Sequence, residues 1–241
     1  MILIEVLYKI KEDLKTLFNY YPFIDCPCGH GIDYDKYWEK RGRNIQSTLS
    51  DWQKERAEIV LQTIEKGSTC LDLGCGDGAL IKYLWEKANI KGMGVDFSDK
   101  ILKQANLLGI QVIKMDLSNL DNVQSLPVVD YIIGFEIIEH MAYPEDLLLC
   151  LQKKARKAMF FSIPNTGYYK HRLRLFFGKF PLQWINHPGE HLRFWTVADI
   201  KWWLNVLGFK IEKLYLYEGV PFLNRLFPSL FAQGILFKII K

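Results

Sequence analysis

Long apolar runs, a regular cysteine framework and a strong excess of one charge are all absent from this sequence of 241 residues. No uninterrupted apolar stretch has the length of a membrane span, and Glu5 and Lys9 interrupt the apolar start that a leader peptide would need. The five cysteines, at 26, 28, 70, 75 and 150, follow no regular spacing, which favours reduced thiols and predicts a cytoplasmic protein. A net charge of +4 does not by itself indicate a nucleic-acid partner.

The composition that remains is that of an ordinary globular protein, with 49% hydrophobic residues and a length sufficient for one α/β domain. Strand-like apolar runs alternate with helical patterns through the middle of the chain. The runs lie at 69–73, 92–96, 111–115, 129–134 and 158–163, and the helical patterns at 78–87, 99–108 and 145–155. This alternation predicts a parallel sheet with helices on both faces, whose strands end at one edge, where ligands bind in such folds.

Both ends of the chain extend this core. The other predicted elements are helices at 1–20, 51–66 and 196–207 and strands at 209–217 and 235–240. We expect the first helix to lie against the domain, and the last to be capped by Thr196 and ended by Gly208. The predicted organisation is an N-terminal helical or lid extension over 1–50 and one domain over 51–241, interrupted by an insertion at 164–194.

The most informative stretch is CLDLGCGDG at 70–78, in which a strand runs into a glycine-rich turn. Glycines at 74, 76 and 78 permit a tight turn and a close approach of a ligand to the main chain. Asp96 follows Gly76 by about twenty positions and suits ribose hydroxyls. The spacing also fits a dinucleotide, but the Asp72 carboxylate would repel a pyrophosphate and suits a ligand that carries an ammonium and a sulfonium. The cofactor we infer is S-adenosylmethionine.

Over most of its length the chain resembles the class I S-adenosylmethionine-dependent methyltransferases. The matching stretches are LDLGCGDG (71–78), GMGVDFS (92–98), VIKMDL (112–117) and VDYIIGFEIIEHMAYPEDLL (129–148). The resemblance implies an α/β fold with a doubly wound, mostly parallel, seven-stranded sheet. It also implies the following cofactor roles: Asp72 near the methionine amino group, the turn with Gly74, Cys75 and Gly76 around the cofactor, Asp96 on the ribose, Phe97 beside the adenine, Asp116 and Leu117 facing the adenine amino group, and Glu136 beside the cofactor.

Glu136, Glu139 and His140 follow the predicted strand at 129–134, on the edge where the cofactor should lie. If the chain turns helical there, the three side chains share a face, and two carboxylates with an imidazole suit Mg²⁺ or Mn²⁺. His191, or His187, would complete the set. The pattern resembles O-methyltransferases of the ubiquinone-biosynthesis type and small-RNA 2′-O-methyltransferases, and this resemblance implies a metal that lowers the pKa of the acceptor hydroxyl.

An interpretation without a metal stays open beside it. In that case Glu136 only neighbours the cofactor and Glu139 starts or caps a helix. His140 or His191 would then act as a general base, because an imidazole titrates near neutral pH.

A second resemblance, to the MetW family of methionine biosynthesis, begins at Ser162. It is carried by a Ser-x-Pro-Asn-x-Gly start, an arginine-bearing helix and a Gly-x-x-Pro exit, and continues through His191, Leu192, Thr196 and Asp199. The long segment before the first strand and the Glu-x-x-Glu-His pattern both depart from that family. The resemblance implies an alternative role as a partner subunit of a homoserine acyltransferase, whereas the retained Glu-x-x-Glu-His favours working chemistry.

The region 168–193 is locally basic and rich in aromatic residues, with Glu190 as its one acid. Its cations are Lys170, Arg172, Arg174, Lys179 and Arg193. We favour an amphipathic helix whose aromatic side chains pack on the core and whose cations face water. A peripheral membrane surface or a lipid-linked substrate is the next interpretation, and RNA is the last.

Two patterns near the start of the chain have weaker meaning. Tyr34, Tyr37 and Trp38 would fold over the cofactor, with Arg41 on its carboxylate, or simply pack. Cys26 and Cys28 predict a loop with free thiols rather than a zinc site. The sequence as a whole predicts an enzyme that methylates a hydroxyl of a small-molecule, sugar or lipid-linked acceptor, with the MetW-like subunit and an RNA 2′-O-methyltransferase as alternatives.

Overall fold

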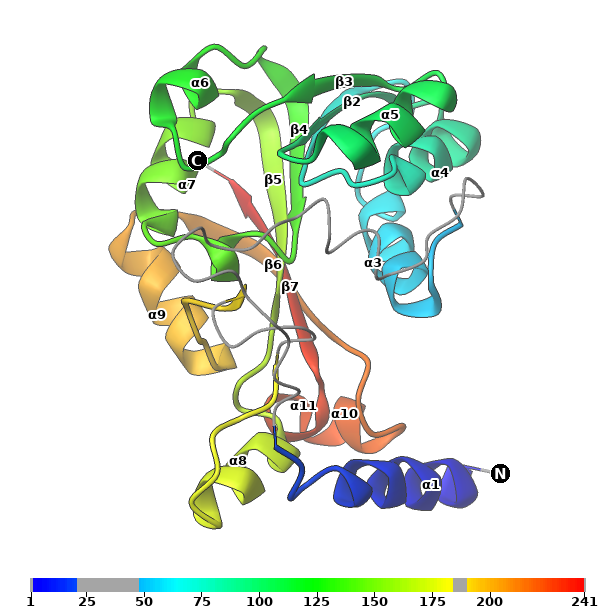
Figure 1. Cartoon of the computed structure of the whole chain (residues 1–241), viewed down its shortest axis with the longest axis vertical. Helices are drawn as coiled ribbons and strands as arrows, with labels where there is room; N and C mark the ends of the chain where they lie inside the picture. The colour runs from blue at the N-terminus through cyan, green and yellow to red at the C-terminus, as the bar shows by residue number, and fades with distance from the viewer. Residues whose placement is uncertain (1, 21–47, 184–189, 241) are drawn as a thin grey trace.

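A mixed sheet of seven strands forms the centre of the computed structural model, which describes residues 2–20, 48–183 and 190–240 (Figure 1). The strands are β1 (Thr69–Leu73), β2 (Lys91–Asp96), β3 (Gln111–Lys114), β4 (Val129–Phe135), β5 (Ala155–Pro164), β6 (Lys210–Tyr217) and β7 (Gly234–Ile240). They lie in the order β3-β2-β1-β4-β5-β7-β6, and β7 is antiparallel to both of its neighbours. The predicted doubly wound, mostly parallel, seven-stranded sheet is confirmed.

Helices cover both faces of this sheet (Figure 1). One face carries α3 (Asp51–Leu61), α4 (Ala79–Ala88) and α5 (Asp99–Leu107), and the other carries α6 (Leu120–Gln124), α7 (Pro144–Leu151) and α9 (Val197–Val206). Neighbouring residues of one strand serve opposite faces: Ile132 packs with Leu147 of α7, whereas Ile133 packs with Val60 of α3. Central strands that are buried on both faces read as continuous apolar runs, which is why the sequence reveals them.

Helix α9 begins and ends at the residues that the sequence predicts, Thr196 and Gly208. Thr196 caps α9 by accepting the Asp199 N–H, and the Asp199 carboxylate accepts the Thr196 N–H in return. Gly208, just beyond this helix, has a φ of +81°. A left-handed residue at this position suits glycine and stops the helix.

Four helices gather at one end of the molecule, beyond the carboxyl end of β5 (Figure 1). They are α1 (Ile2–Lys15), α8 (Tyr169–Phe176), α10 (Leu223–Leu226) and α11 (Pro228–Phe231). Asn165 joins two of the segments, because its buried amide donates to the carbonyls of Ser229 and Ala232. None of the helices in the described ranges has both the length and the apolar character that a bilayer crossing requires.

The interpretation of 168–193 as a helix with aromatic residues inward is wrong for α8. Its buried residues are His171 and Arg174, whereas Leu175 and Phe176 are exposed. The reason lies in the turn that follows α1, whose buried backbone carbonyls need hydrogen-bond donors from elsewhere in the chain. The Arg174 guanidinium donates to the carbonyls of Thr16 (3.3 Å), Leu17 and Asn19 (3.1 Å), which draws the polar face of α8 inward.

Candidate functional site

A cavity opens beside the glycine-rich turn, at the carboxyl edge of the parallel strands. It is lined by Leu49, Gln53, Arg56, Asp72, Gly74, Cys75, Gly76, Asp77, Ala79, Leu80 and Phe135. Gly74 and Gly76 have φ values of +66° and +55°, and the Cys75 N–H between them donates to the Val95 carbonyl at 3.0 Å. A Cβ on Gly74 would lie 2.1 Å from the Ile137 Cδ1, so the turn leaves no room for a side chain there. The structure therefore brings the predicted Asp72, Gly74, Cys75 and Gly76 to one cavity.

Asp96 is the last residue of β2, and its carboxylate stabilises the same glycine-rich turn by hydrogen bonding. One of its carboxylate oxygens accepts the Gly76 N–H at 3.0 Å, and the other accepts the Ser98 N–H at 3.0 Å. Asp96 itself does not line the cavity, but this arrangement holds its carboxylate against Gly76, which does.

The other predicted cofactor residues do not line the cavity. Phe97 is more than half exposed, and Leu117 packs partly against the core. Asp116 is exposed, and its carboxylate accepts both the N–H and the hydroxyl of Ser118. Their roles at the adenine stay predictions.

Three buried carboxyl groups give the cavity an unusual electrostatic character. Asp72, Asp77 and Asp96 are all buried. Burial and then the neighbouring Asp96 raise the pKa of Asp72 well above its ordinary value, while the Arg56 guanidinium opposes this shift. Burial, together with Asp72, also raises the pKa of the Cys75 thiol, so Cys75 is not a thiolate nucleophile. A cavity of this kind favours a cationic ligand over an anionic one.

Arg56 is the residue that the sequence analysis missed. It comes from α3, is only 4% exposed, and places its guanidinium 4.4 Å from the centre of the Trp52 ring. Its Nη1 lies 3.1 Å from the Glu136 carboxylate and donates to the Ser162 hydroxyl at 3.0 Å. The sequence does contain a feature that could have revealed Arg56. It lies on the same helix face as Trp52 and Val60, and a charged residue on an apolar face is unusual.

Glu136 takes part in this network rather than in a metal set. It has a φ of +55°, which is strained for a residue with a side chain, and its carboxylate accepts hydrogen bonds from Ser162 (2.8 Å) and Tyr217 (3.3 Å). The helix on which the shared face depended does not form, since only the short 3₁₀ turn η1 (Ile138–His140) is present there. Without a continuous helix, Glu136 does not share a face with Glu139 and His140.

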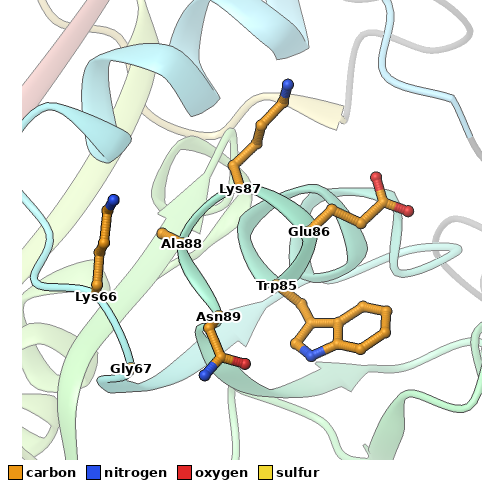
Figure 2. A pocket seen from close by; sticks show the side chains of 7 residues that line it. All are labelled: Lys66, Gly67, Trp85, Glu86, Lys87, Ala88 and Asn89. Atoms are coloured by element: carbon orange, nitrogen blue, oxygen red, sulfur yellow. The ribbon is translucent and has the colours of Figure 1, made fainter.

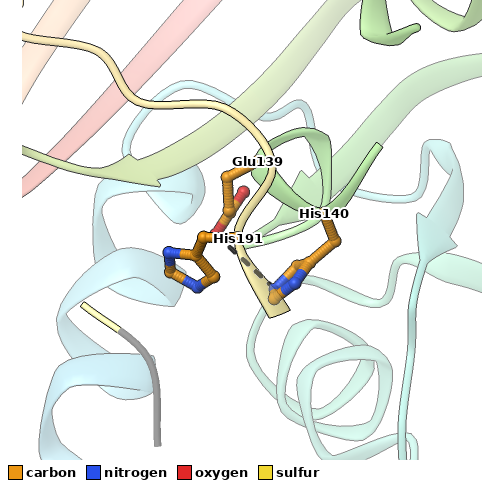
Figure 3. A group of neighbouring side chains, drawn as sticks. All are labelled: Glu139, His140 and His191. Atoms are coloured by element: carbon orange, nitrogen blue, oxygen red, sulfur yellow. Dashed lines mark ion pairs between the residues drawn. The ribbon is translucent and has the colours of Figure 1, made fainter. Parts of the chain in front are cut away.

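Glu139, His140 and His191 do come together (Figure 3). One ligand atom from each lies within 4.8 Å of the others, and the two imidazole rings are 4.7 Å apart. The backbone holds the two segments in place, because the Leu192 and Arg193 N–H groups both donate to the Glu139 carbonyl, at 2.8 and 3.1 Å. Three of the four predicted metal ligands thus form a cluster on the side of η1.

The protonation of this cluster follows from its contacts. The His140 Nδ1 lies against the Glu190 carbonyl, which can only accept, so this nitrogen carries the proton, and the Nε2 lies 3.9 Å from the Glu139 carboxylate. Burial and then His140 lower the pKa of His191 to about 3, so it is neutral at physiological pH. Glu139 is 1% exposed, and neither of its carboxyl oxygens has a hydrogen-bond partner among the described residues. Burial and then Glu136 raise the pKa of Glu139 well above its ordinary value.

The raised pKa of Glu139 predicts a specific dependence of stability on pH. Because the folded protein holds this proton more tightly than the unfolded chain, the carboxyl group lowers stability increasingly as pH rises above its unfolded pKa of about 4.3. We expect Glu139→Gln to melt at nearly the wild-type temperature close to that pH, and progressively higher toward neutral pH, in buffer with EDTA. The exposed Glu86→Gln is the matched control, and a pH-independent offset for Glu139→Gln would contradict the assignment.

Two further regions do not contribute to the site. Lys66, Gly67 and the end of α4 line an open hollow beside the start of β1, at the opposite end of that strand from Asp72 (Figure 2). The predicted lid residues Tyr34, Tyr37, Trp38 and Arg41, the cysteines at 26 and 28, and His187 lie outside the described residues.

Comparisons with known proteins agree with this geometry. Residues 54–239 match the family model of the methionine biosynthesis protein MetW. The chain is 29% identical over 177 residues to a bifunctional methionine biosynthesis protein MetXA/MetW of Rhodopirellula baltica, covering 65% of this chain and 27% of that protein. It is 27% identical over 173 residues to the mitochondrial ubiquinone biosynthesis O-methyltransferase of Candida albicans, covering 67% of this chain and 52% of that protein. The chain thus spans about half, or less, of these relatives.

A solved structure shows the same fold. The S-adenosylmethionine-dependent methyltransferase from Archaeoglobus fulgidus superposes with a TM-score of 0.63 at 19% identity, over 87% of this chain and 100% of that one. The predicted resemblance to the class I fold is confirmed.

Proposed function

The chain belongs to the MetW family and has the fold of the class I S-adenosylmethionine-dependent methyltransferases, and we propose that it is an enzyme that transfers a methyl group from S-adenosylmethionine. The observation that supports this most directly is the cavity beside the glycine-rich turn, where buried Asp72 faces the pocket with Asp77 and Asp96 close by. Buried carboxylates oppose a pyrophosphate and stabilise an ammonium or a sulfonium.

Within this cavity each end of the cofactor has a chemically suited partner. We assign Asp72 to the ammonium, Asp96 to the ribose hydroxyls, and the backbone of Gly74, Cys75 and Gly76 to close contact with the cofactor. Arg56 lines the cavity, and its Nε is buried with no hydrogen-bond partner among the described residues. A donor in that state suits the carboxylate of the methionine moiety.

The cluster of Glu139, His140 and His191 also fits a divalent cation. Two observations support this fit. The buried carboxylate oxygens of Glu139 lack hydrogen-bond partners among the described residues. The His140 Nδ1–H donates to a backbone carbonyl, an arrangement that orients imidazoles in metal sites. Two imidazoles and one carboxylate favour Mn²⁺ over Mg²⁺, because imidazole suits softer ions. A bound ion would supply Lewis acidity that lowers the pKa of an acceptor hydroxyl. Titration of EDTA-treated protein with Mn²⁺ and Mg²⁺ tests this; no heat for either ion, with or without cofactor, would remove the metal.

The side chains by themselves define a route for the proton. As the acceptor oxygen bonds to the methyl carbon and the carbon–sulfur bond breaks, the hydroxyl proton passes to the His140 Nε2. The Glu190 carbonyl keeps the Nδ1 proton in place, and an ionised Glu139 stabilises the imidazolium that forms. The products are the methyl ether and neutral S-adenosylhomocysteine.

This proton route favours O-methylation of a small-molecule, sugar or lipid-linked acceptor, because a hydroxyl needs a base before it attacks whereas a free amine does not. A second candidate function is the partner subunit of a homoserine acyltransferase. It is supported by the MetW family match and by the relative whose name joins MetXA and MetW in one chain. Co-purification with such an acyltransferase, in the absence of any methyl transfer, would favour this alternative.

The proposed cofactor is tested by titrating the purified chain with S-adenosylhomocysteine and, separately, with NAD. We expect heat and a raised melting temperature for the first ligand only. Tight binding of NAD with no response to S-adenosylhomocysteine would overturn the proposal.

A further inference from the structure

Helix α1 presents the wrong face to the protein for an ordinary surface helix. Its buried residue is a carboxylate, Asp13, at 4% exposure. Most of its apolar side chains face solvent: Val6 and Ile10 are half-buried, but Ile2, Leu3, Ile4, Leu7, Tyr8 and Leu14 are exposed, Ile4 by 72%. A helix of a water-soluble surface normally shows the reverse pattern.

Polar contacts fix this orientation. The Asp13 carboxylate accepts hydrogen bonds from the hydroxyls of Tyr168 (2.5 Å) and Tyr169 (3.0 Å), and the ammonium groups of Lys9 and Lys170 lie at 3.4 and 3.8 Å. Burying a carboxylate is costly unless it is bonded in this way. Rotating α1 to hide its apolar side chains would break all of these contacts, so its apolar face is directed outward by the fold itself.

The apolar surface continues from α1 onto its neighbours. The Phe18 ring, just after α1, contacts Phe177 with centroids 5.3 Å apart, and Phe177 contacts Phe176 at 5.2 Å. Phe176 is 79% exposed. Helices α10 and α11 lie at the same end of the molecule (Figure 1), and Phe222, Leu226 and Phe227, in and around α10, are exposed. We call this surface the α1–α8 face, defined by the exposed Ile4, Leu7, Phe18, Leu175, Phe176, Phe177, Phe180, Phe222, Leu226 and Phe227.

We propose that the α1–α8 face docks on the surface of an anionic lipid bilayer. Arg172 and Arg225 are exposed on this face and Lys179 is half-buried, whereas Arg174 and Lys170 are held inside the fold by the turn after α1 and by Asp13. Residues 168–181 and 221–232 contain no acidic residue. Apolar and aromatic side chains that enter the interface, flanked by lysine and arginine that meet phosphate headgroups, are the features of a helix that lies on a membrane. Exposed apolar side chains that gather at one end of a protein mark an interaction site.

The charge of the face argues against a second copy of this chain as its occupant. Two copies would bring the exposed Arg172 and Arg225, with Lys179, toward the same groups of the other copy, which is unfavourable, whereas an anionic bilayer complements them. The four helices also come from three separate parts of the chain and lie at one end, so they can meet a flat surface together (Figure 1).

Docking of this face has a consequence for the acceptor, which rests on the proposed function. Ser162, near the carboxyl end of β5, belongs to the Arg56–Glu136 network, and the chain passes from there through Asn165 into α8. A bilayer at the α1–α8 face would therefore lie on the side where β5 leaves the catalytic edge, and the acceptor class that suits this position is a lipid-linked hydroxyl.

The test is co-sedimentation of the full chain with vesicles of phosphatidylglycerol and phosphatidylcholine, against vesicles of phosphatidylcholine alone. We expect binding to the anionic vesicles only, weakened by added salt. A triple variant, Ile4→Gln, Leu7→Gln and Phe176→Gln, should reduce the partition coefficient by about a hundredfold, because each substituted side chain loses its transfer into the interface. The matched control, Leu107→Gln, Trp202→Gln and Val206→Gln, changes equally exposed side chains on α5 and α9 and should bind like the wild type.

Three results would overturn the proposal: no binding to anionic vesicles at low salt, equal loss in both triple variants, or a wild-type dimer that the first triple variant converts to monomers. Titration of both variants with S-adenosylhomocysteine separates this outcome from the proposed function. Cofactor binding without vesicle binding would contradict the docking proposal alone. No response to S-adenosylhomocysteine in the wild type and in both triple variants would contradict the methyltransferase assignment.

Discussion

Replacing Asp72 with asparagine is expected to weaken S-adenosylmethionine binding by about a hundredfold, since removing one charge of a buried pair costs a few kcal/mol. The same substitution should raise the melting temperature of the free protein at neutral pH. Burial raises the pKa of Asp72 well above its ordinary value, so an ionised carboxylate there destabilises the fold until a cation reaches it. Weaker binding together with a more stable protein is the pattern expected of a binding group held under electrostatic strain.

Isothermal titration and thermal melting of the same two preparations measure both effects. Asp99→Asn is the matched control, because Asp99 lies near the same sheet edge but is exposed and pairs with Lys114. Unchanged affinity in Asp72→Asn, or a lower melting temperature at neutral pH, would contradict the role given to this carboxylate.

Glu139→Gln should reduce the rate of methyl transfer by about a thousandfold while leaving the binding of S-adenosylhomocysteine intact. Loss of the carboxylate that stabilises a catalytic imidazolium has an effect of about this order. Glu139 lies 3.9 Å from the His140 Nε2 and does not line the cofactor cavity, so cofactor binding and methyl transfer should separate cleanly in this variant. The rate is measured as S-adenosylhomocysteine release, with an acceptor found by screening hydroxyl compounds.

A control for this prediction lies close by in sequence. The Glu145 carboxylate accepts the Trp203 indole N–H at 3.0 Å, and a glutamine oxygen can accept the same bond. Glu145→Gln should therefore keep its activity. Full activity in Glu139→Gln would show that the cluster of Glu139, His140 and His191 does not serve the reaction.

The sheet and the glycine-rich turn could be predicted because local sequence determines them. Buried parallel strands read as apolar runs, and the conformation of the turn demands glycine at positions such as Gly74 and Gly76. The meeting of Glu139, His140 and His191 was also predicted, since Glu139 and His140 follow a strand at the ligand-binding edge.

The orientation of side chains across the fold was less accessible. The Asp13 carboxylate meets a hydroxyl 155 positions away, and no periodicity in 1–20 reveals that its apolar face points outward. Glu136 adopts a left-handed backbone that no local pattern announces, which removed it from the predicted metal set. Arg56 could not be assigned to the site from sequence because its partners Glu136 and Ser162 are far from it along the chain.

The central claim, that a buried carboxylate selects a cationic cofactor, is tested most directly by the proton balance of binding. Calorimetric titration with S-adenosylmethionine is carried out at a series of pH values above the ordinary pKa of an aspartate, and is repeated in buffers with different ionisation enthalpies. Because the bound cation stabilises the ionised carboxyl group, we predict proton release by the wild type and none by Asp72→Asn. Binding with the same proton balance in both proteins would contradict the account.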